Sequence, residues 1–384
     1  MNYSKKLEKI PPYLFIEIDR MKKKAISEGK DIISFGVGDP DLPTPDFIVR
    51  AGQKALARPQ NHQYPFGAGA KNFRQAVADW YKRRFGVELN PENEIMALIG
   101  SKEGIGHFPL AFIDEGDIAL VPEPGYPVYA NATVLAGGQP YFMPLKQENG
   151  FLPDFSRIPE EIFRRTKIMF LNYPNNPTSA VAEEQVFSQA VQLAKKYDFI
   201  IAHDAAYSEI YFEQKPISFL AVAGAKEVGI EFHSLSKTFN MTGWRIGMAV
   251  GNEKIIAALT RIKDNYDSGV FTAIQEAATV ALADGDEFAE KNRQVYRRRR
   301  QVLAQGLKTL GWDFTLPPAT FYFWVKVPAG FSSFDFSRKC LKDSAIVVTP
   351  GSGLGPSGEG YIRMALTVDE KRIAEAVSRL AKIK

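Results

Sequence analysis

The chain has 384 residues, of which 45% are hydrophobic and 24% are charged, and its formal net charge is +4. These proportions are typical of globular proteins and exclude a low-complexity or disordered chain. Because one hydrophobic core stops growing beyond about 250–300 residues, the length predicts a large domain and a smaller one.

The N-terminal segment is polar from Met1 to Lys9, so it lacks the apolar core of a secretion signal. No later apolar run reaches the roughly 20 residues that cross a bilayer. The single cysteine, Cys340, cannot form an internal disulfide, and no Cys/His spacing indicates a metal site. We therefore expect a cytoplasmic protein with no metal and no membrane partner. Residues 1–40 are too few for a domain and are expected to pack on the C-terminal one.

Short β-rich runs alternate with helical stretches from residue 93 to residue 251. This alternation predicts an α/β fold with a mostly parallel sheet that helices cover on both faces. The large domain is expected over residues 41–284. The expected strands are residues 95–99, 118–121, 167–172, 199–203, 230–234 and 246–251.

The pattern changes beyond Gly285, where a long helix is expected over residues 287–310. Mixed segments follow, so residues 285–384 are predicted to form a smaller α+β domain. The expected segments are residues 321–327, a helix at 336–342, then 346–349, 361–366 and a final helix from Asp369. The arginines from Arg297 to Arg300 are interpreted as a solvated helix face, because no nucleic-acid recognition motif accompanies them.

Polar side chains follow several of the expected strands at the point where each strand ends. Ligands of parallel sheets bind beyond the carboxyl ends of the strands, so these side chains are candidates for one binding site. They are Ser101, Lys102, Asn176, Asp204, Tyr207, Ser234, Ser236 and Lys237.

Residues 233–247 form the most informative stretch, His-Ser-Leu-Ser-Lys-Thr-Phe-Asn-Met-Thr-Gly-Trp-Arg-Ile-Gly. A lysine that condenses with an aldehyde needs a lowered pKa, which burial and nearby positive charge provide. Arg245 could supply that charge while it binds a phosphate, and Ser234 and Ser236 could donate hydrogen bonds to the same phosphate. The stretch therefore predicts that Lys237 is a reactive amine next to an anion site.

This stretch resembles the lysine signature of the fold type I aminotransferases, and the resemblance runs along essentially the whole chain. It implies a large domain with a seven-stranded sheet, a small domain built from both termini, and the cofactor pyridoxal 5'-phosphate (PLP). By the resemblance, Lys237 bonds covalently to PLP and moves the proton at the substrate Cα, while Ser234, Ser236 and Arg245 bind the phosphate.

The resemblance also assigns the remaining cofactor contacts. Asp204 faces the pyridine nitrogen, Tyr207 and Asn176 contact the phenolic oxygen, and Tyr126 stacks on the ring. Ser101 and Lys102 match positions that hold the phosphate. Each residue also has a plain structural interpretation: a helix N-cap for Asp204 and for Ser101, a core tyrosine for Tyr126, and a turn at Asn176. Ser179 stands where the family usually has glycine, which puts the geometry of that turn in doubt.

Further matches concern the substrate and the partner subunit. Arg363 matches the arginine that binds the substrate α-carboxylate. Gly38 matches the glycine whose backbone approaches the same carboxylate. The alternative for Arg363 is a structural ion pair. Lys102, Tyr126 and Asn176 also border the substrate. Tyr64 resembles the tyrosine that reaches the phosphate of the neighbouring subunit, so a homodimer with shared active sites is expected.

A finer resemblance is to the LL-diaminopimelate aminotransferases. The strings that carry it are residues 10–15, 33–45, 100–104 and 267–275. It implies ping-pong transfer of an amino group from LL-2,6-diaminoheptanedioate to 2-oxoglutarate, in lysine biosynthesis, with Tyr13 as a contributor to substrate binding. An aspartate- or alanine-type aminotransferase of broader specificity and a PLP-dependent C–S β-lyase remain alternatives, because both would keep the same cofactor residues. A nucleic-acid-binding regulator is not expected.

Overall fold

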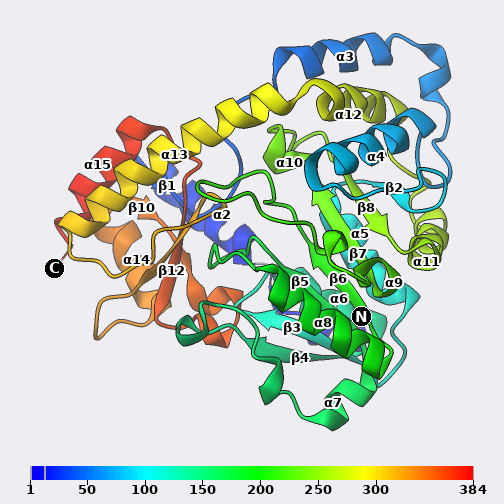
Figure 1. The fold of residues 1–384 in the computed structure, drawn as a ribbon. Helices are drawn as coiled ribbons and strands as arrows, with labels where there is room; N and C mark the ends of the chain where they lie inside the picture. Colours follow the sequence, from blue (N-terminus) through cyan, green and yellow to red (C-terminus); the bar gives the residue numbers. More distant parts are fainter. Residues whose placement is uncertain (1, 13, 384) are drawn as a thin grey trace.

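The computed structural model describes residues 2–12 and 14–383, and a seven-stranded sheet forms its centre (Figure 1). The strand order is β2-β8-β7-β6-β5-β3-β4. Strand β8 runs antiparallel to β2 and β7, and the other neighbours are parallel, so the predicted mostly parallel α/β sheet is confirmed. The strands are β2 (Ile95–Leu98), β3 (Ile118–Glu123), β4 (Gln139–Pro144), β5 (Thr166–Asn172), β6 (Ile200–Asp204), β7 (Gly229–Ser234) and β8 (Gly247–Gly251).

One strand, β4, has no counterpart among the expected strands. It lies at the edge of the sheet, where it pairs only with β3 among the strands described. Pro140 and Pro144 lie within it, and most of its side chains are not buried. Proline is tolerated on an edge strand because its missing N–H can face away from the ladder. In the sequence, the same two prolines argue against a strand.

Helices cover both faces of this sheet. One hydrophobic core joins one face to α4 (Lys71–Phe85), α8 (Glu184–Tyr197) and α12 (Thr272–Asp284). A second core joins the other face to α5 (Ser101–His107), α6 (Val128–Ala136) and α11 (Glu253–Asp264). The remaining helices of this part are α3 (Asp46–Leu56), α7 (Glu160–Arg165), α9 (Ala225–Val228) and α10 (Leu235–Thr238).

A smaller part of the molecule has its own core and its own sheets. Strands β11 (Thr349–Pro350), β12 (Tyr361–Ala365) and β9 (Tyr322–Lys326) form an antiparallel sheet. The N-terminal segment reaches this part, because β1 (Ile33–Ser34) pairs in parallel with β10 (Ile346–Val347). The helices here are α2 (Leu14–Ser27), α13 (Asp286–Thr309), α14 (Ser333–Ser344) and α15 (Glu370–Leu380). The first helix, α1 (Lys5–Glu8), instead contacts α6 of the larger part, where Lys6 Nζ donates to the Leu135 carbonyl at 2.9 Å.

The interpretation of Arg297–Arg300 as a solvated face is wrong for two of these four residues, Arg299 and Arg300. The long helix α13 connects α12 to the smaller part (Figure 1), and its residues Arg299 and Arg300 are buried. Arg299 forms two hydrogen bonds with the Asp41 carboxylate, at 2.6 and 2.7 Å, and Arg300 donates to Glu213 at 2.8 Å. A buried guanidinium is stable only with such partners, and these carboxylates are remote in sequence.

None of the helices within residues 2–12 and 14–383 combines enough length and apolarity to span a bilayer.

Candidate active site

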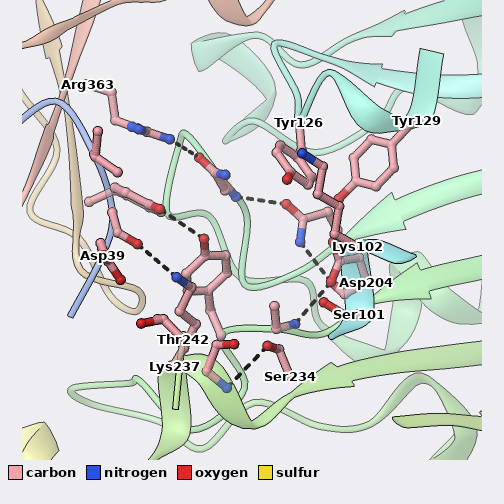
Figure 2. Close-up of a pocket in the computed structure, with 18 of the residues that line it drawn as sticks. Asp39, Ser101, Lys102, Tyr126, Tyr129, Asp204, Ser234, Lys237, Thr242 and Arg363 are labelled. Atoms are coloured by element: carbon pink, nitrogen blue, oxygen red, sulfur yellow. Dashed lines mark hydrogen bonds between the residues drawn. The ribbon is translucent and has the colours of Figure 1, made fainter. Parts of the chain in front are cut away.

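Most of the predicted site residues line one cavity of about 370 Å³ (Figure 2). They are Gly38, Ser101, Lys102, Tyr126, Asn176, Asp204, Tyr207, Ser234, Ser236, Lys237, Arg245 and Arg363. Asn172 and Asp204 are register partners at the carboxyl ends of the parallel strands β5 and β6, and Ser234 ends the neighbouring β7. The cavity therefore forms where parallel strands end, as expected for a sheet of this kind.

Lys237 lies on α10, whose N-cap Ser234 accepts a hydrogen bond from the Ser236 amide. Its Nζ donates to the Gly38 carbonyl at 2.8 Å. Burial lowers the pKa of Lys237 to about 8; the positive charges of Arg245 and Arg363 act in the same direction, and Asp39 opposes them. An appreciable fraction of the amine is therefore neutral near physiological pH, as nucleophilic attack on an aldehyde requires.

Asp204 ends β6 on the opposite side of the cavity from Lys237 (Figure 2). One carboxylate oxygen accepts a hydrogen bond from Tyr129 Oη at 2.8 Å, and the other accepts from the Ala206 amide at 3.3 Å. Burial raises the pKa of Asp204, and these hydrogen bonds only partly offset the effect. A cation placed against Asp204 would stabilise its ionised form.

One end of the cavity is built around Arg363, which is 1% exposed. Its guanidinium donates to Asn176 Oδ1 at 2.8 Å and to the Gly36 carbonyl at 2.9 Å, and it lies 4.3 Å from the centre of the Tyr322 ring. Tyr322 in turn shares a 2.9 Å hydrogen bond with Tyr207. The planar guanidinium at the cavity wall suits a carboxylate ligand.

The opposite end suits a phosphate. Ser101 and Lys102 begin α5 directly after Gly100, whose φ is +72° and where a Cβ would lie 2.3 Å from Arg245 Nη2. Glycine suits this position for two reasons: a side chain would overlap the Arg245 guanidinium, and the positive φ is a conformation that other residues rarely adopt. Among the described residues, the buried Ser236 hydroxyl has no hydrogen-bond partner. A phosphate bound between the hydroxyls, the start of α5 and the Arg245 guanidinium would accept a hydrogen bond from Ser236.

These three observations fit PLP. Its phosphate matches the unsatisfied Ser236 hydroxyl beside Arg245, its pyridine nitrogen matches the buried Asp204, and its aldehyde matches the Lys237 amine. Ser101, Ser234 and Ser236 could hold the phosphate together with Arg245.

In the turn that contains Ser179, the serine takes a backbone conformation that glycine adopts more easily. Ser179 adopts a φ of +64°, in the left-handed region that glycine favours. Its hydroxyl lies 2.6 Å from Thr320 Oγ1 and donates to the Tyr322 carbonyl at 2.7 Å. These buried hydrogen bonds offset the backbone strain, and they attach the Asn176 turn to the strand that carries Tyr322.

One predicted residue that the structure describes, Tyr64, does not line this cavity. Tyr64 is 76% exposed and stacks on Phe66, which is 71% exposed, with ring centres 5.6 Å apart. Tyr64 therefore does not contribute to the cavity of its own chain. Tyr13 lies outside the described residues.

Several lining residues were not predicted from the sequence. They are Val37, Asp39, Tyr129, Asn172, Ala206, Thr242 and Tyr322. Tyr129 and Tyr322 stand among apolar neighbours in an expected helix and an expected strand, so no local pattern separates them from core tyrosines. Asp39 directly follows Gly38, and this adjacency is the feature of the sequence that could have predicted its place in the cavity wall.

A group of possible metal ligands lies outside the cavity. Glu103, His107 and Asp267 bring ligand atoms within 4.8 Å of one another. The ammonium of Lys263 donates to Glu103 at 3.0 Å and to Asp267 at 2.8 Å. One lysine ammonium thus already pairs with both carboxylates.

Comparison with known proteins gives concordant matches. The family described as aminotransferase class I and II matches residues 30–380. The LL-diaminopimelate aminotransferase of Syntrophobacter fumaroxidans is 54% identical over 381 residues, which cover 99% of this chain and 98% of that protein. The Aquifex aeolicus protein of the same name is 53% identical over 383 residues, covering 100% and 99%.

Solved structures agree. A substrate-bound structure of BacF from Bacillus subtilis superposes with a TM-score of 0.97 at 40% identity, covering 100% of this chain and 98% of that one. A single mutant of Thermus thermophilus aspartate aminotransferase gives a TM-score of 0.93 at 28% identity, with 100% of both chains covered.

We predict that Lys237 of the apoprotein titrates near pH 8. Because only the neutral amine attacks an aldehyde, reductive labelling of Lys237 with acetaldehyde and cyanoborohydride should rise with pH and reach half its maximum near pH 8. Mass spectrometry of the peptide that carries Lys237 measures this, with Lys237→Ala as the control for assignment. A half-maximum near 10.5, the value for an ordinary lysine, would contradict the prediction.

Proposed function

The chain belongs to the class I and II aminotransferases, which depend on PLP, and we propose that it transfers an amino group from LL-diaminopimelate to 2-oxoglutarate as a step of lysine biosynthesis. The observation that carries this substrate assignment is the identity of 53–54% to LL-diaminopimelate aminotransferases along almost the full length of both chains. The geometry of the cavity supports the chemistry, and the relatives support the choice of amino acid.

The phosphate-binding and ring-binding residues orient the cofactor. Ser101, Lys102, Ser234, Ser236 and Arg245 bind the phosphate. Tyr126 would stack on the ring, and Asn176 and Tyr207 could donate hydrogen bonds to its phenolic oxygen. Bound in this way, PLP supplies an electron-withdrawing ring that stabilises negative charge at the substrate Cα.

Asp204 would keep the pyridine nitrogen of bound PLP protonated. The buried position supports this role because a carboxylate without water gains strongly from a cation beside it. Tyr129 donates to one carboxylate oxygen and so fixes the orientation of the side chain. The remaining lone pairs are available for the ring.

Lys237 is the catalytic residue. Its Nζ would hold PLP when the cofactor is bound, and the free amine could move the proton at the substrate Cα. The lowered pKa supports both tasks, since a general base works best when its pKa is near the working pH.

Arg363 binds the substrate α-carboxylate, with Gly38 and Asn176 beside it. In the structure, Asn176 Oδ1 accepts a hydrogen bond from Arg363, so the amide already holds the guanidinium in the plane that a carboxylate would meet. Any Cβ at position 38 would lie 2.0 Å from Tyr322 Oη, which explains the glycine. Lys102, Tyr126 and Tyr13 complete the substrate-binding set.

We further propose a homodimer with shared active sites, located in the cytoplasm. The exposed Tyr64–Phe66 pair supports this arrangement, because two stacked aromatic rings of this exposure gain from burial against another chain. Tyr64 then completes the phosphate site of the partner. The single, buried Cys340 suits a reducing compartment.

We predict a marked preference among amino donors. With 2-oxoglutarate as acceptor, kcat/KM for LL-diaminopimelate should exceed the values for aspartate and alanine by at least about a hundredfold, because a site built around a polar side chain rejects donors that lack it. Steady-state kinetics with the purified holoenzyme measure this. Values within tenfold of one another would indicate the broader aminotransferase, and release of pyruvate and ammonia from cysteine conjugates would indicate the β-lyase.

For the dimer, we predict that two inactive variants restore each other. In a mixed dimer of Tyr64→Ala and Lys237→Ala subunits, one of the two sites has both native residues, so random exchange should recover about a quarter of the wild-type activity. Sedimentation of each variant, with differently tagged subunits to prove exchange, serves as the control. No recovery after proven exchange, or an active monomer, would refute the shared site.

A further inference from the structure

Glu231 is a fully buried carboxylate that the cavity does not use. It lies on β7, where side chains alternate between the two faces of the sheet. Ser234 therefore points to the cavity side with Phe232, whereas Glu231 and His233 point to the opposite side. His203 is the register partner of Glu231 on β6, and it lies on that same opposite side, one residue before Asp204.

Five hydrogen-bond donors converge on this one carboxylate. The donors to Oε1 are Tyr81 Oη at 2.8 Å, Ser218 Oγ at 2.8 Å and His233 Nε2 at 2.9 Å. The donors to Oε2 are His203 Nδ1 and the Phe219 amide, both at 2.8 Å. Burial alone would raise the pKa of Glu231, but the hydrogen bonds from His203 and His233 outweigh it and hold the pKa below its usual range. Glu231 is therefore a buried anion whose acceptor capacity is filled.

The first histidine connects this anion to the turn that carries Asn176. An amide can only donate, so the 3.3 Å contact from the Tyr173 amide requires His203 Nε2 to be the acceptor. The proton of the neutral ring is then on Nδ1, facing Glu231. Glu231 thus fixes the tautomer that receives the Tyr173 amide, three residues before Asn176.

The second histidine connects the anion to two other segments of the cavity. His233 directly precedes Ser234 and α10, which carries Lys237. Its Nδ1 lies 3.3 Å from Ser208 Oγ, and Ser208 directly follows Tyr207. With Nε2–H donated to Glu231, Nδ1 can accept the Ser208 hydroxyl proton.

We propose that Glu231 is a positioning residue: from the far face of the sheet, it holds the strand ends and turns that carry Asn176, Asp204, Tyr207 and Ser234 at the spacing that the cofactor requires. This role goes beyond the proposed reaction and does not depend on which amino acid is the donor. A core filler would need only volume, and apolar residues of similar size satisfy that need at no desolvation cost. By contrast, the five hydrogen bonds to the two carboxylate oxygens of Glu231 fix the positions of the residues that donate them.

The test is Glu231→Gln, which keeps the volume but replaces one acceptor oxygen with an NH2 group that must face donors. We expect the variant to fold, as judged by circular dichroism. Its dissociation constant for PLP, from absorbance titration of the apoprotein, should rise by about tenfold or more. The pH midpoint of the visible absorbance of bound PLP should also shift, because the groups around the ring move.

Phe187→Leu is the matched control. Phe187 packs against the His203 ring at 4.9 Å between ring centres, on the same side of the sheet, without a hydrogen bond to the network. It should lower the unfolding temperature while the PLP dissociation constant stays within about twofold. If Glu231→Gln does not fold, Ser208→Ala tests the same connection through one hydrogen bond and should raise the dissociation constant about threefold.

Native affinity and an unchanged midpoint in folded Glu231→Gln, or in Ser208→Ala if only that variant folds, would overturn the proposal. So would equal loss of PLP affinity in Phe187→Leu at the same loss of thermal stability, because the effect would then follow from general destabilisation.

Discussion

The burial of Asp204 at the carboxyl end of β6 is the constraint around which the site is organised. A carboxylate in this position has lost most of its water, and hydrogen bonds from Tyr129 and the Ala206 amide do not restore its usual pKa. A cationic ring nitrogen beside Asp204 would offset the free-energy cost of ionising the buried carboxyl group. PLP bound with its nitrogen there would have Arg245 and the serines to hold its phosphate and Lys237 to hold its aldehyde.

The sheet explains how distant parts of the sequence supply these groups. Parallel strands β5, β6 and β7 end at one edge, so Asn172, Asp204 and Ser234 become neighbours although more than sixty residues separate the first from the last. Alternation along the same strands sends His203, Glu231 and His233 to the opposite face. The carboxyl ends of these strands therefore line the cavity, and in our proposal Glu231 on the opposite face holds the lining residues in place through the same strands.

The sequence was sufficient to predict most of the residues that line the cavity, because many of them follow a recognisable strand or begin a helix. It was insufficient where the deciding partner is remote: Arg299 and Arg300 look solvent-exposed until Asp41 and Glu213 are brought to them. Strand β4 was missed because its prolines suit only an edge, and edges are a property of the whole sheet. Tyr129 and Tyr322 were missed because a tyrosine in an apolar run has the same local pattern whether it lies in a core or lines a cavity.

The most direct test of this account is the protonation state of the ring nitrogen against Asp204. PLP labelled with ¹⁵N at the pyridine position, bound to the enzyme, should give the NMR shift of a protonated pyridine in the wild type across the neutral pH range. In Asp204→Asn, which removes the charge but keeps the shape, the shift should move to that of an unprotonated ring. An unprotonated signal in the wild type, or the same shift in both proteins, would contradict the central role of the buried carboxylate.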